Sequence, residues 1–271
     1  MEVIIFAIIK DEHHYIEEWV EYHHKIGIDH IYLLEDIDSK SHQELLSKYD
    51  YVTLTKLIDV INDDDRNDII NKIDKVHLAY KIFYRLYKDK CDWCAFIDVD
   101  EFIMCDNIKE ILKTQSDKPC LTMSWLIMKS MGYITHPNHW QKYSVLETYT
   151  EYNTTSDFSF DGQVKQIINC NPKFYDIIKY ENWEKPPHVI KEEYNNFYGD
   201  IKLKHFICKS FEEYVSRLQK RGECSNGDTY SRNYLYWIYV NDELMDYKDY
   251  IWNLFNIKDN WDNIKYSNYN I

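Results

Sequence analysis

Apolar and polar residues alternate along the first half of the chain in blocks that predict strands followed by helices. Val3–Ile9 is an unbroken apolar run, which is typical of a central strand in a parallel sheet. The next apolar positions recur at the spacing of one helix face: Ile16, Trp19, Val20, His23 and Ile26. We expect Asp11 to cap this helix at its start and Gly27 to end it.

The same alternation continues as far as Trp125. Further strands are predicted at His30–Leu34, Tyr51–Ile58, Trp93–Asp98 and Cys120–Trp125, and helices at Ser41–Tyr49, Asp68–Tyr87 and Asn107–Lys113. This pattern predicts an α/β fold, in which a mostly parallel sheet carries helices on both faces. Sheets of this kind bind ligands at the carboxyl ends of their strands.

The second half of the chain is less regular. The segment Thr148–Asn171 is polar and then extended, and a strand is predicted at Lys202–Cys208. A helix is predicted at Ser210–Lys220, because Ser210 and Glu213 have the spacing of a capping box at its start.

The last part of the chain is crowded with aromatic residues. We therefore expect residues 1–222 to form the main domain and residues 223–271 to form a helical C-terminal extension packed on it. The aromatic side chains of the extension either dock it onto the sheet, form a homodimer interface or serve the acceptor of a reaction.

Composition and charge narrow the classes of function. The chain has 271 residues, of which 45% are hydrophobic, enough for one large α/β domain or a domain with a small appendage. Its 46 acidic and 32 basic side chains give a net charge of −14, which excludes nucleic acid as the main partner. An anionic small ligand would need a local positive charge, such as a bound metal with a few Lys or Arg side chains.

The sequence also bears on the cellular compartment. No apolar run reaches the roughly 18 residues of a membrane-spanning helix. Val3–Ile9 lacks a basic start and a cleavage site, so we interpret it as a strand and not as a signal peptide. Seven scattered cysteines favour a reducing, cytoplasmic location with free thiols. Cys91 and Cys94 would point to opposite faces of a strand, so we do not expect them to share a zinc ion.

The strongest chemical signal is the acidic end of a predicted buried strand. Apolar residues lead directly into Asp98-Val99-Asp100, so that two carboxylates arrive at the ligand-binding edge of the sheet. Two carboxylates one residue apart can share a hard cation such as Mn²⁺ or Mg²⁺, which also binds phosphate oxygens. We therefore predict a divalent metal site at this DXD motif. The alternative is an acidic strand end that is merely solvated.

Two histidine pairs, His13-His14 and His23-His24, look like a metal cluster at first sight. They lack the spacing of a compact helical metal pair, in which two ligands lie four residues apart. We interpret them as partly exposed positions on the first helix.

Several further stretches occur in a characteristic order: Lys10-Asp11-Glu12, Glu18–His23, Gly27-Ile28-Asp29, Glu35–Ser39, Ile97–Phe102, Trp125–Gly132, Val164–Ile168, Lys204–Tyr214 and Arg221-Gly222. Together they resemble the family-2-like and family-92-like glycosyltransferases, over about residues 3 to 222. Within them, Ile127–Met131 departs from the small residues usual there.

The resemblance implies a GT-A fold and transfer of a sugar from a nucleotide-sugar. It places Glu12 and Asp36 at the nucleoside, Asp98 at the ribose or the metal, and Asp100 on the metal. It also suggests His205 as a metal or phosphate ligand. The alternatives are an acid that complements a helix dipole for Glu12, a solvated loop acid for Asp36, and a core residue for His205.

The basic residues expected at the diphosphate are Lys165, Lys209 and Arg221, unless internal carboxylates pair with them. Inverting transfer also needs a carboxylate base to accept the proton of the acceptor hydroxyl. Asp161 is the first candidate and Glu101 the second, although Asp161 also suits a turn before Gly162.

The sequence therefore predicts a metal-dependent glycosyltransferase that uses a nucleotide-sugar donor, UDP-linked by preference, and a glycan, lipid or protein acceptor. A nucleotidyltransferase is the alternative enzyme. It would be expected to carry a glycine-rich loop after the first strand, and residues 10–15 contain no glycine. A non-catalytic protein that binds a glycan or a partner on the same fold is the other alternative.

Overall fold

The computed structural model describes residues 1–62, 82, 86–153, 164–174, 198–220, 237, 240 and 241. The chain divides into two compact units. The first comprises Met1–Trp125 and Phe160–His205, and the second comprises Leu126–Ser159 and Phe206–Ile271. The domain boundary expected after residue 222 lies outside the described residues.

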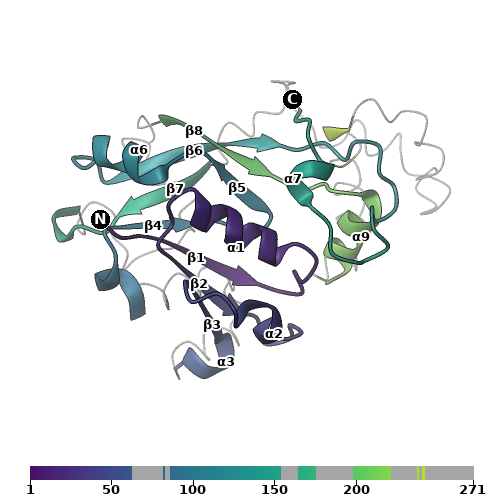
Figure 1. Ribbon diagram of the computed structural model, residues 1–271, viewed down its shortest axis with the longest axis horizontal. Helices are drawn as coiled ribbons and strands as arrows, with labels where there is room; N and C mark the ends of the chain where they lie inside the picture. The colour runs from purple at the N-terminus through teal and green to yellow at the C-terminus, as the bar shows by residue number, and fades with distance from the viewer. Residues whose placement is uncertain are drawn as a thin grey trace, which may run out of the picture. The chain divides into compact units, whose positions relative to one another are not determined.

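An eight-stranded sheet forms the body of the first unit, with the strand order β3-β2-β1-β4-β7-β6-β8-β5 (Figure 1). The strands are β1 (Val3–Ile9), β2 (His30–Glu35), β3 (Val52–Lys56), β4 (Trp93–Phe96), β5 (Glu101–Met104), β6 (Cys120–Ile127), β7 (Val164–Asn169) and β8 (Tyr198–His205). Each strand predicted from the sequence is present: β1 has the predicted ends, and the other strands differ from the prediction by a few residues at one or both ends.

The two halves of this sheet differ in strand direction. Strand β1 pairs in parallel with β2 and β4, and β2 pairs in parallel with β3. Strand β7 is antiparallel to both β4 and β6, and β5 is antiparallel to β8. The predicted α/β class is confirmed. The antiparallel pairings are an addition that the local sequence pattern did not predict.

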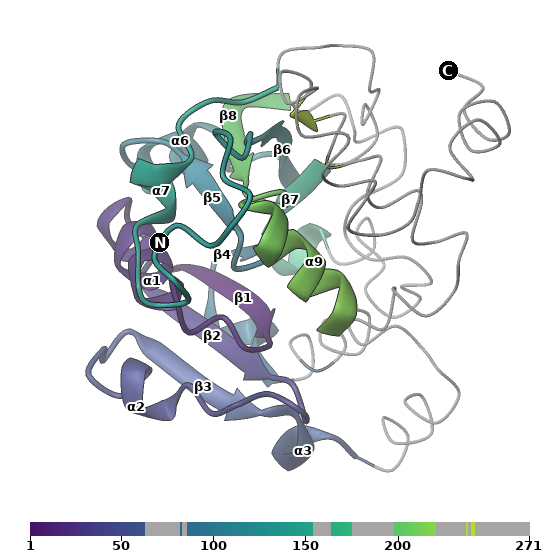
Figure 2. The same cartoon turned by 90° about the vertical axis from the view of Figure 1, so that its right-hand side faces the viewer.

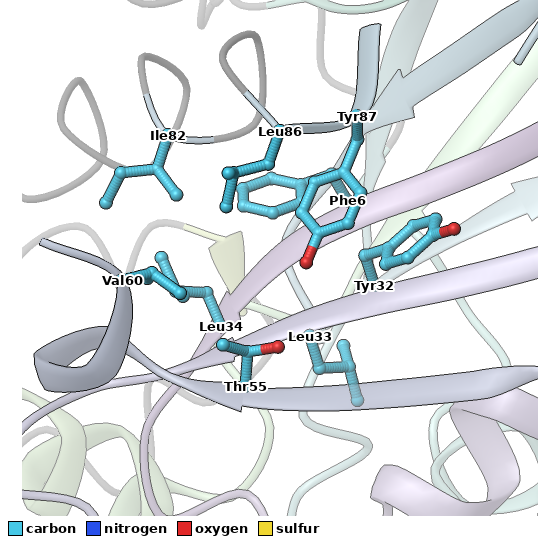
Figure 3. A pocket seen from close by; sticks show the side chains of 9 residues that line it. All are labelled: Phe6, Tyr32, Leu33, Leu34, Thr55, Val60, Ile82, Leu86 and Tyr87. Carbon is cyan, nitrogen blue, oxygen red and sulfur yellow. The ribbon is translucent and has the colours of Figure 1, made fainter. Parts of the chain in front are cut away.

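One face of the parallel half packs against the segment that ends at Tyr87. Ile4, Phe6 and Leu34 belong to a buried apolar cluster that also includes Ile82. Figure 3 shows Ile82 and Tyr87 facing Phe6 in a pocket with an almost wholly apolar lining. Residues 82, 86 and 87 are helical, as expected, whereas the rest of the helix predicted at Asp68–Tyr87 lies outside the described residues.

The helices connect and flank these strands. They are α1 (Ile16–Lys25), α2 (Gln43–Leu46), α3 (Leu57–Val60), α6 (Ile108–Thr114), α7 (Val145–Thr148) and α9 (Phe211–Lys220), with 3₁₀ turns at Lys88–Lys90 and Pro172–Phe174. Figure 2 shows α2 and α3 beside β3. The strand expected to reach Ile58 stops at Lys56, because the chain turns there into α3. Among the described residues, no helix is long and apolar enough to cross a membrane.

The predicted cap of α1 is wrong. The helix begins at Ile16 with Tyr15 at the N-cap, and no side chain caps it. Asp11 instead adopts a left-handed conformation with φ of 57°, and its carboxylate accepts a hydrogen bond from the Lys40 N–H at 2.9 Å. Asp11 therefore ties the β1–α1 loop to the loop after β2, a contact between segments that are distant in sequence.

The predicted end of α1 is confirmed. Gly27 follows the helix with φ of +104°, a conformation that a residue with a side chain rarely adopts. A Cβ at this position would lie 3.3 Å from Asn107 Oδ1. That atom accepts a hydrogen bond from the Lys109 N–H and caps α6. Glycine thus permits both the turn and the close approach of α6.

The expectation that His23 is partly exposed is wrong, because its side chain is fully buried. Its Nδ1 lies 2.8 Å from the Trp19 carbonyl oxygen, and its Nε2 accepts a hydrogen bond from the Ile103 N–H at 3.3 Å. Both ring nitrogens therefore have partners, which offsets the cost of burying them. Burial lowers the pKa of His23 to about 3.

This burial predicts a loss of stability in mild acid. The unfolded chain takes up a proton at His23 near pH 6.5, whereas the folded chain does so only near pH 3. The contribution of His23 to the free energy of unfolding is therefore fully present above pH 6.5. Below that, it falls by up to about 1.4 kcal/mol per pH unit as the pH approaches 3. Urea unfolding between pH 3 and 8 measures it. His23→Gln should flatten this dependence, and His24→Gln, at the exposed neighbouring residue, should not. Equal slopes in both variants would contradict the assignment.

The second unit contains α7 and α9 and a buried carboxylate. The Ser210 hydroxyl accepts a hydrogen bond from the Glu213 N–H at 3.2 Å, and the Glu213 carboxylate accepts one from the Ser210 N–H at 3.2 Å, which confirms the predicted capping box. Glu213 also accepts hydrogen bonds from the hydroxyls of Tyr143, at 2.6 Å, and Tyr149, at 2.9 Å. The cap thus joins the start of α9 to the segment around α7.

Candidate active site

The turn between β4 and β5 delivers the acidic motif to the carboxyl end of β4. The Glu101 N–H donates to the Asp98 carbonyl oxygen at 3.0 Å, and the Asp98 N–H donates to Glu101 Oε2 at 2.8 Å. These two bonds close the turn and leave 39% of the Asp98 side chain exposed. Since β4 is parallel to β1, the motif lies at the edge where ligands bind in such sheets.

Strand β7 brings a buried lysine to this turn. The pair Ala95–Ile167 sets the register of β4 and β7, so Lys165 lies level with the residues that follow β4. Its ammonium group lies 3.0 Å from Asp98 Oδ2 and 3.5 Å from Glu101 Oε2, and 1% of its side chain is exposed. A cation this deeply buried requires such partners, because an unpaired buried charge is strongly destabilising.

Strand β8 brings His205 to the same turn. The antiparallel register places His205 opposite Glu101, and His205 Nε2 lies 3.7 Å from Asp100 Oδ1. The ring of Trp125 on β6 packs edge-on against the imidazole, with 4.3 Å between the ring centroids. His205 is thus buried beside the acidic motif.

The charges in this cluster shift the two carboxyl groups in opposite directions. Desolvation would raise the pKa of Asp98, but the charge and hydrogen bond of Lys165, together with the nearby His205, outweigh it, and the pKa is lowered. Burial raises the pKa of Glu101 well above its usual range, because the Lys165 charge compensates only in part. Asp98 is therefore an anion in neutral solution, whereas burial disfavours the charged form of Glu101.

The donor set suits a hard divalent cation. Asp100 and His205 present an oxygen and a nitrogen ligand 3.7 Å apart, with the exposed Asp98 carboxylate in the same turn. Among the described residues, no three His, Cys, Asp or Glu side chains are already gathered as a metal cluster. Asp100 and His205 could hold a divalent cation if phosphate oxygens and water supplied its remaining ligands.

The residues expected at the nucleoside lie at the ends of the first two strands. Asp36 directly follows β2, is buried and lies 3.6 Å from the Lys10 ammonium. Glu12 follows β1, and its carboxylate accepts a hydrogen bond from the Tyr15 hydroxyl. The predicted location of both residues is correct, and their contact with a nucleoside stays a prediction.

A buried Glu35–His42 pair beside these residues was missed from the sequence. His42 Nδ1 lies 2.9 Å from Glu35 Oε1, and His42 Nε2 accepts a hydrogen bond from the Glu12 N–H at 3.0 Å. The pair fixes the backbone of the β1–α1 loop next to the predicted nucleoside site. The one signal available was a glutamate at the end of an apolar strand, followed by a histidine near the start of a helix.

Comparison with protein families places the chain in one of them. The family model described as "Glycosyltransferase family 92" matches residues 7–223. This chain belongs to that family. The match covers every strand and helix described above except the first residues of β1.

Solved structures give only distant likenesses. TarS from S. aureus, residues 1–349, is 10% identical with a TM-score of 0.42, covering 82% of this chain and 64% of that one. HddC from Yersinia pseudotuberculosis is 12% identical with a TM-score of 0.36, covering 81% and 99%. A 4-diphosphocytidyl-2C-methyl-D-erythritol synthase from Anaerococcus prevotii DSM 20548 is 10% identical with a TM-score of 0.35, covering 67% and 74%. No curated protein matches the chain. The chain thus spans less than two thirds of TarS 1–349, and none of these likenesses assigns it a substrate.

Three further residues predicted for the site are not tested by the structure. Lys209 lies in the second unit, is buried with a φ of 36°, and its charge helps to lower the pKa of Glu213. Asp161 and Arg221 lie outside the described residues. The roles predicted for these three residues therefore stay predictions.

Proposed function

We propose that this family 92 glycosyltransferase moves a sugar from a nucleotide-sugar, UDP-linked by preference, to a glycan, lipid or protein acceptor, and that it requires Mn²⁺ or Mg²⁺. The observation that supports the proposal is the cluster at the end of β4. There, strands β7 and β8 bring Lys165 and His205 to Asp98 and Asp100. This cluster combines ligands for a hard cation with one buried positive charge, and a diphosphate needs both in a chain of net charge −14.

Each residue of the cluster has a distinct task in this proposal. Asp100 and His205 would hold the cation, and the exposed carboxylate of Asp98 would contact the cation or the ribose. When bound, the cation would neutralise the charge that develops on the leaving diphosphate. Lys165 keeps Asp98 ionised and fixes its orientation. Glu101 supports Lys165 from within the core, which fits its complete burial.

The base that accepts the acceptor proton belongs to a different part of the chain in our proposal. Glu101 is fully buried, and its Oε2 accepts a hydrogen bond from the Asp98 N–H and lies 3.5 Å from the Lys165 ammonium, so its carboxyl group does not face an acceptor hydroxyl. Asp161 is therefore still our candidate for the base of an inverting reaction. Asp161→Asn should suppress sugar transfer and leave nucleotide binding unchanged.

A panel of nucleotide-sugars tests the proposed donor class. We expect a UDP-sugar with Mn²⁺ to raise the melting temperature of the full chain, and EDTA to remove the shift, because the diphosphate and the cation bind together. Slow release of the nucleoside diphosphate, followed by chromatography, should accompany binding. Nucleoside monophosphates with Mn²⁺ serve as the control, because they lack the diphosphate that bridges to the cation.

The same experiment separates the alternatives. Release of pyrophosphate from a nucleoside triphosphate and a sugar phosphate would identify a nucleotidyltransferase instead. A thermal shift that survives EDTA would refute the requirement for a cation. If no nucleotide-sugar shifts the melting temperature and none is turned over, the proposed donor class is wrong.

A further inference from the structure

The segment between β6 and α7, in the second unit, exposes large apolar side chains. Met131, Tyr133 and Trp140 have 38%, 41% and 38% of their surface exposed. Leaving part of a tryptophan ring exposed on a loop forgoes part of the free energy of burying it. Such a position suggests that another molecule covers the ring.

Polar contacts hold this tryptophan in a defined orientation. Its indole N–H donates to Glu212 Oε1 at 3.2 Å, and its ring stacks on His136 with 4.8 Å between the centroids. The backbone N–H groups of Trp140 and Asn138 both donate to His136 Nδ1, at 2.9 and 3.1 Å. The His136 N–H in turn donates to Glu212 Oε2 at 2.7 Å. The loop is thus wrapped around one imidazole and tied to α9.

The backbone of this loop is strained where it presents the ring. His139 and Trp140 have φ angles of 47° and 64°, in the left-handed region that residues with large side chains seldom adopt. Strain of this kind is unfavourable and persists only where surrounding contacts enforce it. Burial lowers the pKa of His136, so the ring stays neutral and its Nδ1 can accept both N–H groups. The hydrogen bonds to His136 therefore hold the loop in a strained conformation, and this conformation keeps the indole of Trp140 exposed in a fixed orientation.

We propose that Trp140 and Glu212 form a binding site for a neutral pyranose ring of the acceptor. The face of an indole stacks on the C–H face of a sugar, and a rigid aromatic ring loses little conformational entropy on binding. In the exposed Glu212 carboxylate, Oε1 accepts the Trp140 indole N–H and Oε2 accepts the His136 N–H, and each oxygen has a second lone pair for a sugar hydroxyl. The same carboxylate would repel the diphosphate of a donor, which is why the occupant is the uncharged acceptor sugar. The acceptor role rests on the proposed function, whereas binding of a sugar does not.

Direct binding tests the site on the full-length chain. The probes are the methyl α- and β-pyranosides of glucose, galactose, mannose and N-acetylglucosamine, together with a printed glycan array. Saturation-transfer NMR should detect at least one of these sugars on the wild type. Trp140→Ala should lose at least tenfold in affinity, Trp140→Phe should retain part of it, and Glu212→Gln should weaken it less than Trp140→Ala does. Tyr152→Ala removes a similarly exposed aromatic ring (45% exposed) outside the loop and is the matched control.

Kinetics with the best-bound glycan then distinguish this site from the donor site. Trp140→Ala should raise the KM for the glycan about tenfold and leave hydrolysis of the nucleotide-sugar without acceptor unchanged. If Trp140→Ala does not fold, Trp140→Phe and Glu212→Gln carry the test. Sugar binding without any donor turnover would refute the proposed function but keep the site. The assignment would be overturned if wild type and Trp140→Ala bound sugar equally, or if no probe bound to the wild type. It would also be overturned if Trp140→Ala changed the oligomeric state in light scattering or lost hydrolysis of the donor.

Discussion

Lys165→Met is expected to abolish turnover of the nucleotide-sugar and to lower the free energy of unfolding by about 3–5 kcal/mol, the usual cost of removing one partner of a buried ion pair. Methionine fills nearly the same volume, so the change isolates the charge. Without the ammonium, Asp98 loses its partner at 3.0 Å and Glu101 its partner at 3.5 Å. Urea unfolding and release of the nucleoside diphosphate measure the two effects.

The matched control is Lys173→Met, at an exposed lysine shortly after β7. It should change stability by less than about 0.5 kcal/mol and leave turnover intact. The double variant Lys165→Met, Glu101→Gln should recover part of the stability, because it removes the carboxyl group that lost its partner, and it should stay inactive. If Lys165→Met turned over the donor at the wild-type rate, Lys165 would be a structural residue only.

Asp100→Asn is expected to lower turnover about 100- to 1000-fold and to weaken Mn²⁺ binding, while the fold survives. The substitution keeps the shape of the side chain but removes the charge that faces His205 at 3.7 Å. Loss of one electrostatic contact to a developing charge costs about 2.7–4 kcal/mol of transition-state stabilisation. Titration calorimetry with Mn²⁺ and a nucleoside diphosphate, together with steady-state kinetics, measures both consequences.

Asp106→Asn is the control for this change, because Asp106 is an exposed carboxylate just beyond β5. It should bind Mn²⁺ and turn over the donor as the wild type does. Equal Mn²⁺ affinity in wild type and Asp100→Asn would place the cation elsewhere. Equal loss in the two aspartate variants would point to a general effect of charge on a protein of net charge −14.

The parallel half of the sheet could be predicted because each of its strands is marked by residues that are adjacent in the sequence. The run Val3–Ile9 is apolar on both faces, which only a strand covered on both sides tolerates, and the helical spacing after it predicts α1. The stop at Gly27 followed from one residue, since glycine alone readily adopts its positive φ. The start of the same helix was predicted wrongly, because Asp11 bonds to a loop from another part of the chain.

In the candidate site, too, the residues that could be predicted are those whose signal is local in the sequence. Asp98 and Asp100 were identified because the motif and the strand that carries it are contiguous in sequence. Lys165 and His205 were suggested by resemblance, but no local pattern could show that they lie beside those acids. Strand registers decide that proximity: Glu101 pairs with His205, and Ala95 pairs with Ile167, with long stretches of chain between the partners.

The sequence by itself determined the fold class, the family and the acidic motif, because each depends on residues close together in the chain or on motifs in a fixed order. The tertiary structure alone decided which side chains meet and what burial does to them. It turned His23 from an expected surface residue into a neutral core residue, and it gave Asp98 and Glu101 opposite pKa shifts around one lysine. Desolvation and charge pairing depend on distances in space, and those distances are set by strand pairing across the whole sheet.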